Sequence, residues 1–248
     1  MRDVKVESAG SPGSLRTQHQ EKTWSKRASS WDHSSMPGLE KIAAAVISYA
    51  SPVDGCDVVD LGCGSGQLTL DLARTAKSVI AVDFSAEMLE LLDQRAAAAG
   101  LGNIETRRST LQALDLPPAS LDVVVTNYAL HHLRHPEKAA LLQKAAVWLR
   151  PGGRIVIGDM MFGLSARDEG RQIIAGKIRS IAKRGPAGWW RIAKNGWKML
   201  VAREECPAPV PVWEDMLRKA GFTGLRSERV VAEAAVVAAE RPDTEGHR

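Results

Sequence analysis

Three glycines alternate with small residues after a short apolar run, and this pattern restricts the fold more than any other stretch of the chain. The run ends with Val58, Val59 and Asp60. The glycines are Gly62, Gly64 and Gly66. A helix-compatible segment, residues 67–73, follows at once, and the predicted helix spans residues 66–76. The pattern predicts a strand, a tight turn and a helix, because glycine lets the backbone turn sharply and approach a ligand. Such a turn binds nucleotide-like cofactors at the carboxyl end of a strand.

The spacing of the glycines indicates which cofactor fits. A dinucleotide-binding turn reads G-x-G-x-x-G, and the pyrophosphate lies at the helix N-terminus. Here the third glycine comes one position early, and Gln67 occupies the last position, where its side chain would crowd a pyrophosphate. Residues 58–66 instead resemble motif I of the class I methyltransferases, which use S-adenosylmethionine (SAM). The resemblance implies that SAM is the cofactor, that S-adenosylhomocysteine (SAH) is the product, and that no metal is needed.

Length and composition set the outer limits. The chain has 248 residues, 44% of them hydrophobic and 25% charged, which is typical of one globular α/β domain. It has no apolar run long enough to span a bilayer and no signal-peptide core. Its cysteines, Cys56, Cys63 and Cys206, are odd in number and lack metal-ligand spacing, so we expect a cytoplasmic protein. The net charge of +4 permits an anionic partner without demanding nucleic acid.

A second acidic residue ends the next predicted strand, residues 78–83. Asp83 lies 17 residues beyond Gly66, where an acid faces the crevice of the first turn and can accept both hydroxyls of a ribose. The alternative is that the residue only caps the following helix, residues 86–99, although Ser85 could do this itself. The string from Val82 to Leu89 resembles the family's second motif. The resemblance implies that Asp83 binds ribose and that Phe84, with Met88 in the same string, belongs to the cofactor site.

Further cofactor contacts are implied by the resemblance. After the predicted strand at residues 103–108, the family usually carries an Asp that meets the adenine amino group, but Thr110 stands there in this chain. The Leu111 amide remains available for adenine. Asn127, which ends the predicted strand at residues 121–127, would lie beside the methionyl group. The resemblance also implies that Asp60 orients the cofactor ammonium and that the glycine turn, including Cys63 as a small filler, cradles the methionyl part.

Two adjacent histidines are the candidates for proton transfer. An oxygen, nitrogen or sulfur acceptor must lose a proton, and histidine is the usual base near neutral pH. His131 and His132 follow the fourth predicted strand. Since neighbouring residues on a helical turn diverge by about 100°, at most one should face substrate. We predict His132 as the base and keep His131 as the alternative. Asp159, at the end of the predicted strand 154–159, would orient the base or bind an acceptor hydroxyl. Either histidine could instead serve only a structural hydrogen bond.

The remaining segments complete the predicted organisation. Residues 1–20 are polar and expected to be poorly ordered, and 241–248 form a polar tail. Between them we predict one methyltransferase domain, 21–240. Its first part, 21–50, would be a helical lid in which Trp31 contacts the cofactor, or else packs on the core. A basic, Trp-rich segment, 164–206, predicts a helical cap over the substrate pocket. Residues 222–230 and 231–239 are predicted as the two closing strands, although the alanines of the second also suit a helix.

The family resemblance covers about residues 24–163 and, more loosely, 211–240. It implies a doubly wound, Rossmann-like α/β fold with a seven-stranded sheet whose last strand is antiparallel. Strings around His131 and Pro151 are familiar in its small-molecule branch, which includes quinone C-methyltransferases and natural-product O-methyltransferases. O-methylation of a small organic acceptor, in secondary metabolism or cofactor biosynthesis, is therefore the leading hypothesis. The basic, Trp-bearing cap fits an aromatic or anionic acceptor. C-methylation of a quinone-like ring, RNA methylation and SAM binding without catalysis remain alternatives. The sequence leaves a monomer and a homodimer equally open.

Overall fold

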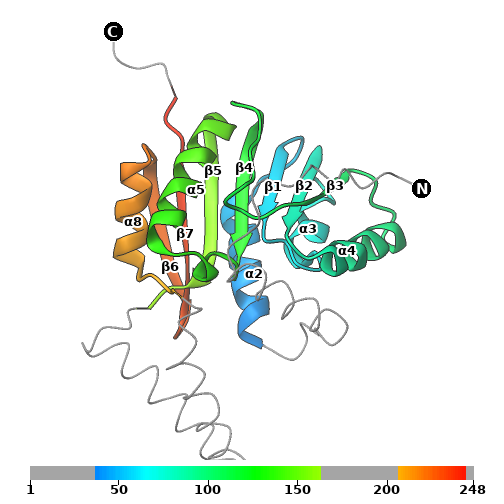
Figure 1. Cartoon of the computed structure of the whole chain (residues 1–248), viewed down its shortest axis with the longest axis horizontal. Helices are drawn as coiled ribbons and strands as arrows, with labels where there is room; N and C mark the ends of the chain where they lie inside the picture. Colours follow the sequence, from blue (N-terminus) through cyan, green and yellow to red (C-terminus); the bar gives the residue numbers. More distant parts are fainter. Residues whose placement is uncertain (1–36, 163–205, 244–248) are drawn as a thin grey trace, which may run out of the picture.

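The computed structural model describes residues 37–162 and 206–243, which build a seven-stranded sheet with the order β3-β2-β1-β4-β5-β7-β6 (Figure 1). The strands are β1 (Asp57–Leu61), β2 (Ser78–Asp83), β3 (Ile104–Arg108), β4 (Leu121–Asn127), β5 (Leu149–Met160), β6 (Thr223–Val231) and β7 (Ala234–Glu240). The first five strands are parallel, and β7 runs antiparallel to both of its neighbours. The predicted fold class, including the antiparallel last strand, is confirmed.

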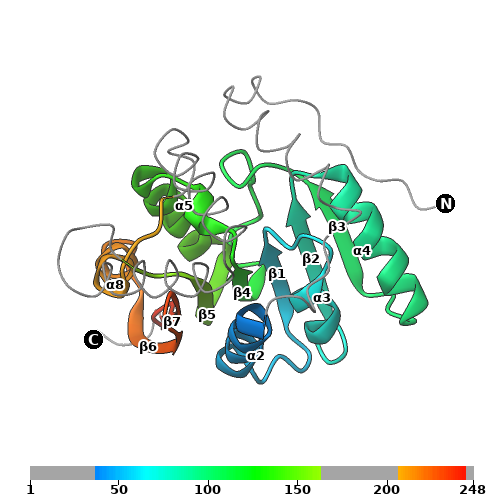
Figure 2. The same cartoon turned by 90° about the horizontal axis from the view of Figure 1, so that it is seen from below.

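Helices cover both faces of the sheet. They are α2 (Pro37–Ala50), α3 (Gln67–Leu72), α4 (Ala86–Ala98), the short 3-10 helix η2 (Leu130–His132), α5 (His135–Trp148) and α8 (Val210–Lys219). Figure 2 shows α2 and α5 on opposite sides of the sheet. The same division follows from the alternating side chains of the central strands. Val58 packs with the α2 and α3 side chains, whereas its neighbour Val59 packs with those of α5 and α8.

The strand order reverses between β1 and β4, and this places the candidate site. Both strands are buried along most of their length, as expected for parallel strands between two helical layers. In a sheet of this kind, ligands bind in the crevice outside the carboxyl ends of the strands where the order reverses. The glycine turn follows β1 and Asn127 ends β4, so both lie at this edge.

Close packing of α2 against β5 depends on one glycine. A Cβ atom on Gly158 would lie 2.4 Å from Cγ2 of Val46 and 2.8 Å from Cγ2 of Ile42, both in α2. Because Gly158 has no side chain, α2 can lie directly against β5 at this position. Both α2 side chains are fully buried there.

The segment before α8 packs beside η2. The Cys206 amide donates a hydrogen bond to the His131 carbonyl oxygen, with 2.6 Å between the two atoms. On its other side, the Cys206 carbonyl accepts a hydrogen bond from the Lys138 ammonium, which also lies 5.4 Å above the Trp213 ring. This lysine is fully buried, so its hydrogen bond offsets part of the cost of removing the ammonium from water.

Candidate functional site

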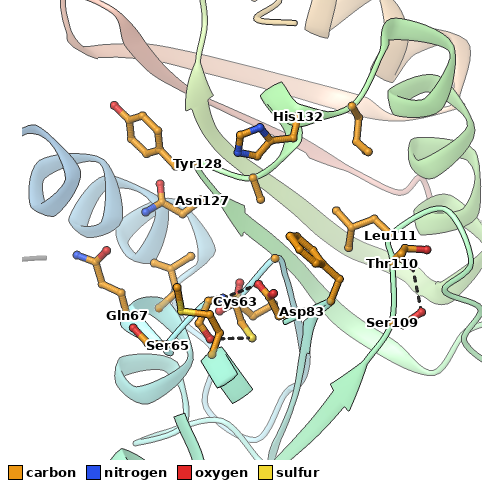
Figure 3. A pocket seen from close by; sticks show the side chains of 18 of the residues that line it. Cys63, Ser65, Gln67, Asp83, Ser109, Thr110, Leu111, Asn127, Tyr128 and His132 are labelled. Carbon is orange, nitrogen blue, oxygen red and sulfur yellow. Dashed lines mark hydrogen bonds between the residues drawn. The ribbon is translucent and has the colours of Figure 1, made fainter. Parts of the chain in front are cut away.

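An open pocket lies at the carboxyl edge of the sheet (Figure 3). Its volume is about 1100 Å³, including the solvent space at its mouth. Its walls come from the loops after β1, β2, β3 and β4. The residues that line it are Leu39, Asp60, Gly62, Cys63, Gly64, Ser65, Gln67, Leu68, Asp83, Phe84, Met88, Ser109, Thr110, Leu111, Gln112, Asn127, Tyr128, Ala129, His132 and Leu133. The pocket thus occupies the crevice at which the strand order reverses.

The glycine turn lines this pocket through Gly62 and Gly64. Its backbone conformation disfavours any residue type other than glycine. Gly62, Gly64 and Gly66 have φ values of +73°, +53° and +91°, in the region that favours glycine. A Cβ on Gly62 would lie 2.4 Å from Cβ of Ala129. At Gly64, by contrast, an added Cβ would meet no atom within 4 Å, so open space remains beside the turn. The turn is therefore tight where it meets protein and open at Gly64.

Asp83 holds the glycine turn in place. Its Oδ2 atom accepts a hydrogen bond from the Gly64 amide at 3.0 Å, and its Oδ1 atom accepts one from the Ser85 amide at 2.9 Å. Burial raises the pKa of Asp83, although both amides favour its charged form. Ser85 caps α4 by accepting a hydrogen bond from the Met88 amide, as anticipated. Each Asp83 oxygen keeps a lone pair for a ligand hydroxyl.

Asp60 lies deeper, with 1% of its surface exposed. Its Oδ2 atom accepts a hydrogen bond from the Thr69 hydroxyl at 2.7 Å. Burial raises the pKa of Asp60 to about 7, because a charged carboxylate loses its hydration and the nearby Asp83 adds repulsion; the Thr69 hydrogen bond opposes this. A cationic group in the pocket would favour the charged form of Asp60.

Cys63 is a buried filler of the turn. Its thiol lies 3.6 Å from the Gly64 carbonyl oxygen, to which it donates. Burial, together with Asp83 and Asp60, raises the pKa of the Cys63 thiol well above its usual range. A thiol that resists ionisation is a poor nucleophile.

Five further predicted cofactor residues line the same pocket: Phe84, Met88, Thr110, Leu111 and Asn127. Gly66, also predicted to hold the cofactor, is not among the lining residues and packs against Leu92. In Figure 3, Thr110 and Leu111 lie across the pocket from Gln67 and Ser65. The Asn127 Oδ1 atom is buried and finds no hydrogen-bond partner among the residues that the structure describes. A buried acceptor of this kind is suited to a ligand that brings a donor.

The two histidines take different places. His132 lines the pocket together with Tyr128, and Figure 3 shows the two rings near each other. His131 is buried outside the lining, and its Nδ1 atom lies 2.6 Å from Oδ1 of Asp159. The structure thus brings Asp159 to His131, and it brings His132 to the residues proposed to hold the cofactor.

The remaining lining residues were not predicted as part of the site. They are Leu39, Ser65, Gln67, Leu68, Ser109, Gln112, Tyr128, Ala129 and Leu133. Tyr128 carries the clearest overlooked signal, because it directly follows Asn127 at the end of a buried strand. Its φ of +51° is unusual for a residue with a side chain, and strain of this kind is concentrated at functional sites.

Some predictions fall beyond the part of the chain that the structure describes. Trp31, the rest of the lid before residue 37, and residues 164–205 of the predicted cap are among them. Within residues 37–162 and 206–243, no cluster of three or more His, Cys, Asp or Glu side chains could hold a metal ion. None of the helices in these two ranges is both long and apolar enough to cross a membrane.

Residues 58–153 match the family model described as a methyltransferase domain. An arsenite methyltransferase of Aquipseudomonas alcaligenes is 34% identical over 130 residues, which are 48% of this chain and 37% of that protein. A ubiquinone biosynthesis O-methyltransferase of Paracidovorax citrulli is 34% identical over 108 residues, 43% of this chain and 44% of that protein. The chain thus spans less than half the length of either relative.

Solved structures share the fold. Phosphoethanolamine N-methyltransferase 1 of Haemonchus contortus, solved with phosphoethanolamine and SAH, superposes with a TM-score of 0.67 at 21% identity. That match covers 96% of this chain and 51% of the other. The match to the domain model begins in β1 and runs through the glycine turn, Asp83 and the histidines. The matched domain model, these relatives and the shared fold together support a methyltransferase domain of the class I, SAM-dependent type in residues 58–153.

Proposed function

We propose that this protein transfers the methyl group of SAM to a small organic acceptor, with an acceptor oxygen as the leading target. The observation that carries the proposal is that one pocket holds the glycine turn, Asp83 and His132 together. A cofactor cradle and a candidate base therefore open into the same space. The methyltransferase relatives support the reaction type, and the ubiquinone O-methyltransferase among them supports oxygen as the acceptor atom.

The residues present fit SAM. The open space beside Gly64 leaves room for a ligand against the turn. The Asn127 Oδ1 atom, which has no hydrogen-bond partner within residues 37–162 and 206–243, suits the cofactor ammonium. Asp60 would add a carboxylate near that ammonium, and Asp83, oriented by two backbone amides, would accept hydrogen bonds from ribose. Phe84 would flank the adenine, as the family resemblance implies, and the Leu111 amide would be available to it.

The chain's own residues would contribute position and proton transfer. SAM, when bound, supplies a methyl group already activated by a positively charged sulfur. The pocket would align the acceptor and exclude water, which is much of the task in an in-line displacement. His132 would remove the proton that a hydroxyl acceptor loses as it is methylated. An imidazole suits that step because its ordinary pKa is about 6.5.

The relative that methylates arsenite does not determine the acceptor here. Trivalent arsenic prefers soft thiolate ligands. Of the described cysteines, Cys63 is buried in the glycine turn, and Cys56 precedes β1 at the opposite edge of the sheet. Only Cys206 lies near η2, so a thiolate site is not built from these three residues.

The test uses SAM labelled in its methyl group. The protein is incubated with an extract of its source cells, and RNA, protein and small molecules are then separated. We expect the label in a small organic molecule, with mass spectrometry locating it on oxygen. Label on a ring carbon would instead support C-methylation of a quinone-like acceptor. Label in RNA would overturn the proposal, as would no transfer to any fraction by a protein shown to bind SAM.

A further inference from the structure

Asp159 is a buried carboxylate that the proposed transfer does not use directly. Its exposed fraction is 1%, and its Oδ1 atom lies 2.6 Å from Nδ1 of His131. The Met160 amide donates to the same oxygen at 2.7 Å. Such a carboxylate strongly favours a protonated imidazole at its side, because burial weakens the screening by water.

The two imidazole rings lie against each other. The ring centroids of His131 and His132 are 4.1 Å apart, and the rings are tilted by 48°. Two positive charges at this distance repel each other, so protons bind to such a pair in two separated steps. The first proton should go to the ring beside Asp159, and the second should be resisted by the ring that is already charged.

We propose that Asp159 directs the first proton of this pair onto His131 and thereby keeps His132 neutral. His131 and Asp159 are then positioning residues that act through His132. The purpose of this arrangement rests on the proposed function, in which a neutral His132 accepts a proton from the acceptor. Its test, however, does not depend on methyl transfer, so the two proposals can fail separately.

Other titratable groups near the two histidines are the same in the wild type and in a variant changed only at Asp159. Tyr128 lies edge-on to His131, with 6.2 Å between ring centroids, and burial raises its phenol pKa, so it stays neutral. Glu233 is close enough to affect Tyr128. Asp60 and Asp83 line the same pocket as His132, and the Lys138 ammonium is fixed on the Cys206 carbonyl. A change confined to Asp159 therefore isolates its own effect.

The experiment follows the histidine ring signals by NMR in the full-length protein labelled with ¹³C-histidine, over a pH titration. The chain has six histidines, and His131→Gln and His132→Gln each identify one signal by its loss. In the wild type we expect the pKa of His131 above about 6.5 and that of His132 below it. The reverse order would overturn the proposal without any variant at Asp159.

Asp159→Asn keeps the side-chain shape and removes the charge. We expect the pKa of His131 to fall and that of His132 to rise by about one unit, because the proton no longer prefers His131. In a His131→Gln background the Asp159→Asn substitution should not raise the pKa of His132. The expected rise depends on the loss of positive charge from His131, and that ring is absent in this background. An unchanged or lowered His132 pKa in Asp159→Asn alone contradicts the proposal. Asp215→Asn, an exposed carboxylate on α8 paired with Lys219, is the matched control and should leave both titrations unchanged.

Discussion

The Asp83 carboxylate and the Gly64 amide are joined by a 3.0 Å hydrogen bond that links the end of β2 to the glycine turn after β1. The second oxygen of the same carboxylate accepts the Ser85 amide at the start of α4. One buried side chain therefore fixes two walls of the pocket before any ligand arrives. Asp83 also lines the pocket in which we propose that the ribose binds.

Asp83→Asn tests this double role. The amide can accept one of the two backbone hydrogen bonds, but its NH₂ group would face the second N–H, so one donor loses its partner. We expect the Kd for SAH, measured by calorimetry, to rise about 10- to 100-fold, which corresponds to about 1.4–3 kcal/mol. Asp93→Asn, an exposed carboxylate on α4, is the control and should leave Kd unchanged. A folded Asp83→Asn protein with wild-type affinity would refute the role of Asp83.

Gly62→Ala and Gly64→Ala form a matched pair within one turn. The Cβ at Gly62 would collide with Ala129, so we expect a loss of about 2–4 kcal/mol in the free energy of unfolding, measured in urea. At Gly64 the added Cβ has space, so only the strain of the positive φ should lower the free energy of unfolding, by about 1–2 kcal/mol. SAH affinity should nevertheless fall in Gly64→Ala. Equal stability losses in the two variants would contradict this division of the turn.

Gly158→Ala tests the packing of α2 on β5. The new methyl group would lie within 3 Å of Val46 and Ile42, so the helix must shift or the side chains must leave their rotamers. We expect a destabilisation of about 1–3 kcal/mol, measured by urea unfolding. The double variant Gly158→Ala with Val46→Ala should recover part of it, since the 2.4 Å contact is relieved. No recovery would show that the strain lies elsewhere.

The raised pKa of Asp60 predicts a pH dependence for stability. Burial moves that pKa from 3.8 to about 7, so between these values the folded state binds more protons than the unfolded state. The contribution of this group to stability is therefore largest below the lower value and is lost as pH rises toward the upper one. Urea unfolding of Asp60→Asn should lack this decline, whereas an identical pH profile in both proteins would contradict the assignment.

Ligand affinity should change with pH in the opposite sense. A bound ammonium favours the charged Asp60, so SAH binding should release a proton and tighten as pH rises toward about 7. Calorimetry in buffers of different ionisation enthalpy measures that proton release. Asp60→Asn should reduce it, and any remaining release belongs to Asp83, whose pKa burial also raises. Affinity that is independent of pH in the wild type would place the ammonium away from Asp60.

Apolar runs predicted the central strands well because burial dictates their composition. The predicted strands 78–83 and 121–127 agree with β2 and β4 to the residue. The helix after the glycine turn was predicted as 66–76 but spans only Gln67–Leu72. Gly66 lies outside it with φ +91°, and the amides of Arg74 and Thr75 bond three residues back rather than four. Local geometry of this kind is not encoded in hydrophobic periodicity.

Boundaries that depend on partner strands were predicted less well. The fifth strand was predicted as 154–159, whereas β5 begins at Leu149 through pairing with Leu121 and then changes register. The last strand was predicted as 231–239, with its alanines leaving helix possible, and β7 spans Ala234–Glu240. Arg241, predicted as part of the tail, still exchanges backbone hydrogen bonds with Gly152 and Gly153. Small residues suit this strand because it is buried on both faces.

The candidate site was predictable wherever a residue lies at or next to the carboxyl end of a strand. The positions of Asp60, Asp83 and Asn127 follow from that rule, since the carboxyl ends of parallel strands meet at one edge. The separate places of His131 and His132 depend on η2 and on the pairing of Asn127 with Gly158, which sets Asp159 beside the loop. The adjacency of the two histidines predicted that at most one of them faces the pocket. Which one does so depends on the register between β4 and β5, which the sequence pattern does not give.

The most direct measurement is a calorimetric titration of the full-length protein with SAM, SAH and the dinucleotide NAD⁺. The glycine spacing, the open space at Gly64 and the Asn127 oxygen, which has no hydrogen-bond partner among the described residues, predict one site that binds both SAM and SAH. No heat is expected from NAD⁺, whose pyrophosphate Gln67 would crowd. Binding of NAD⁺ in place of SAM, or of neither, would contradict the assignment of this pocket.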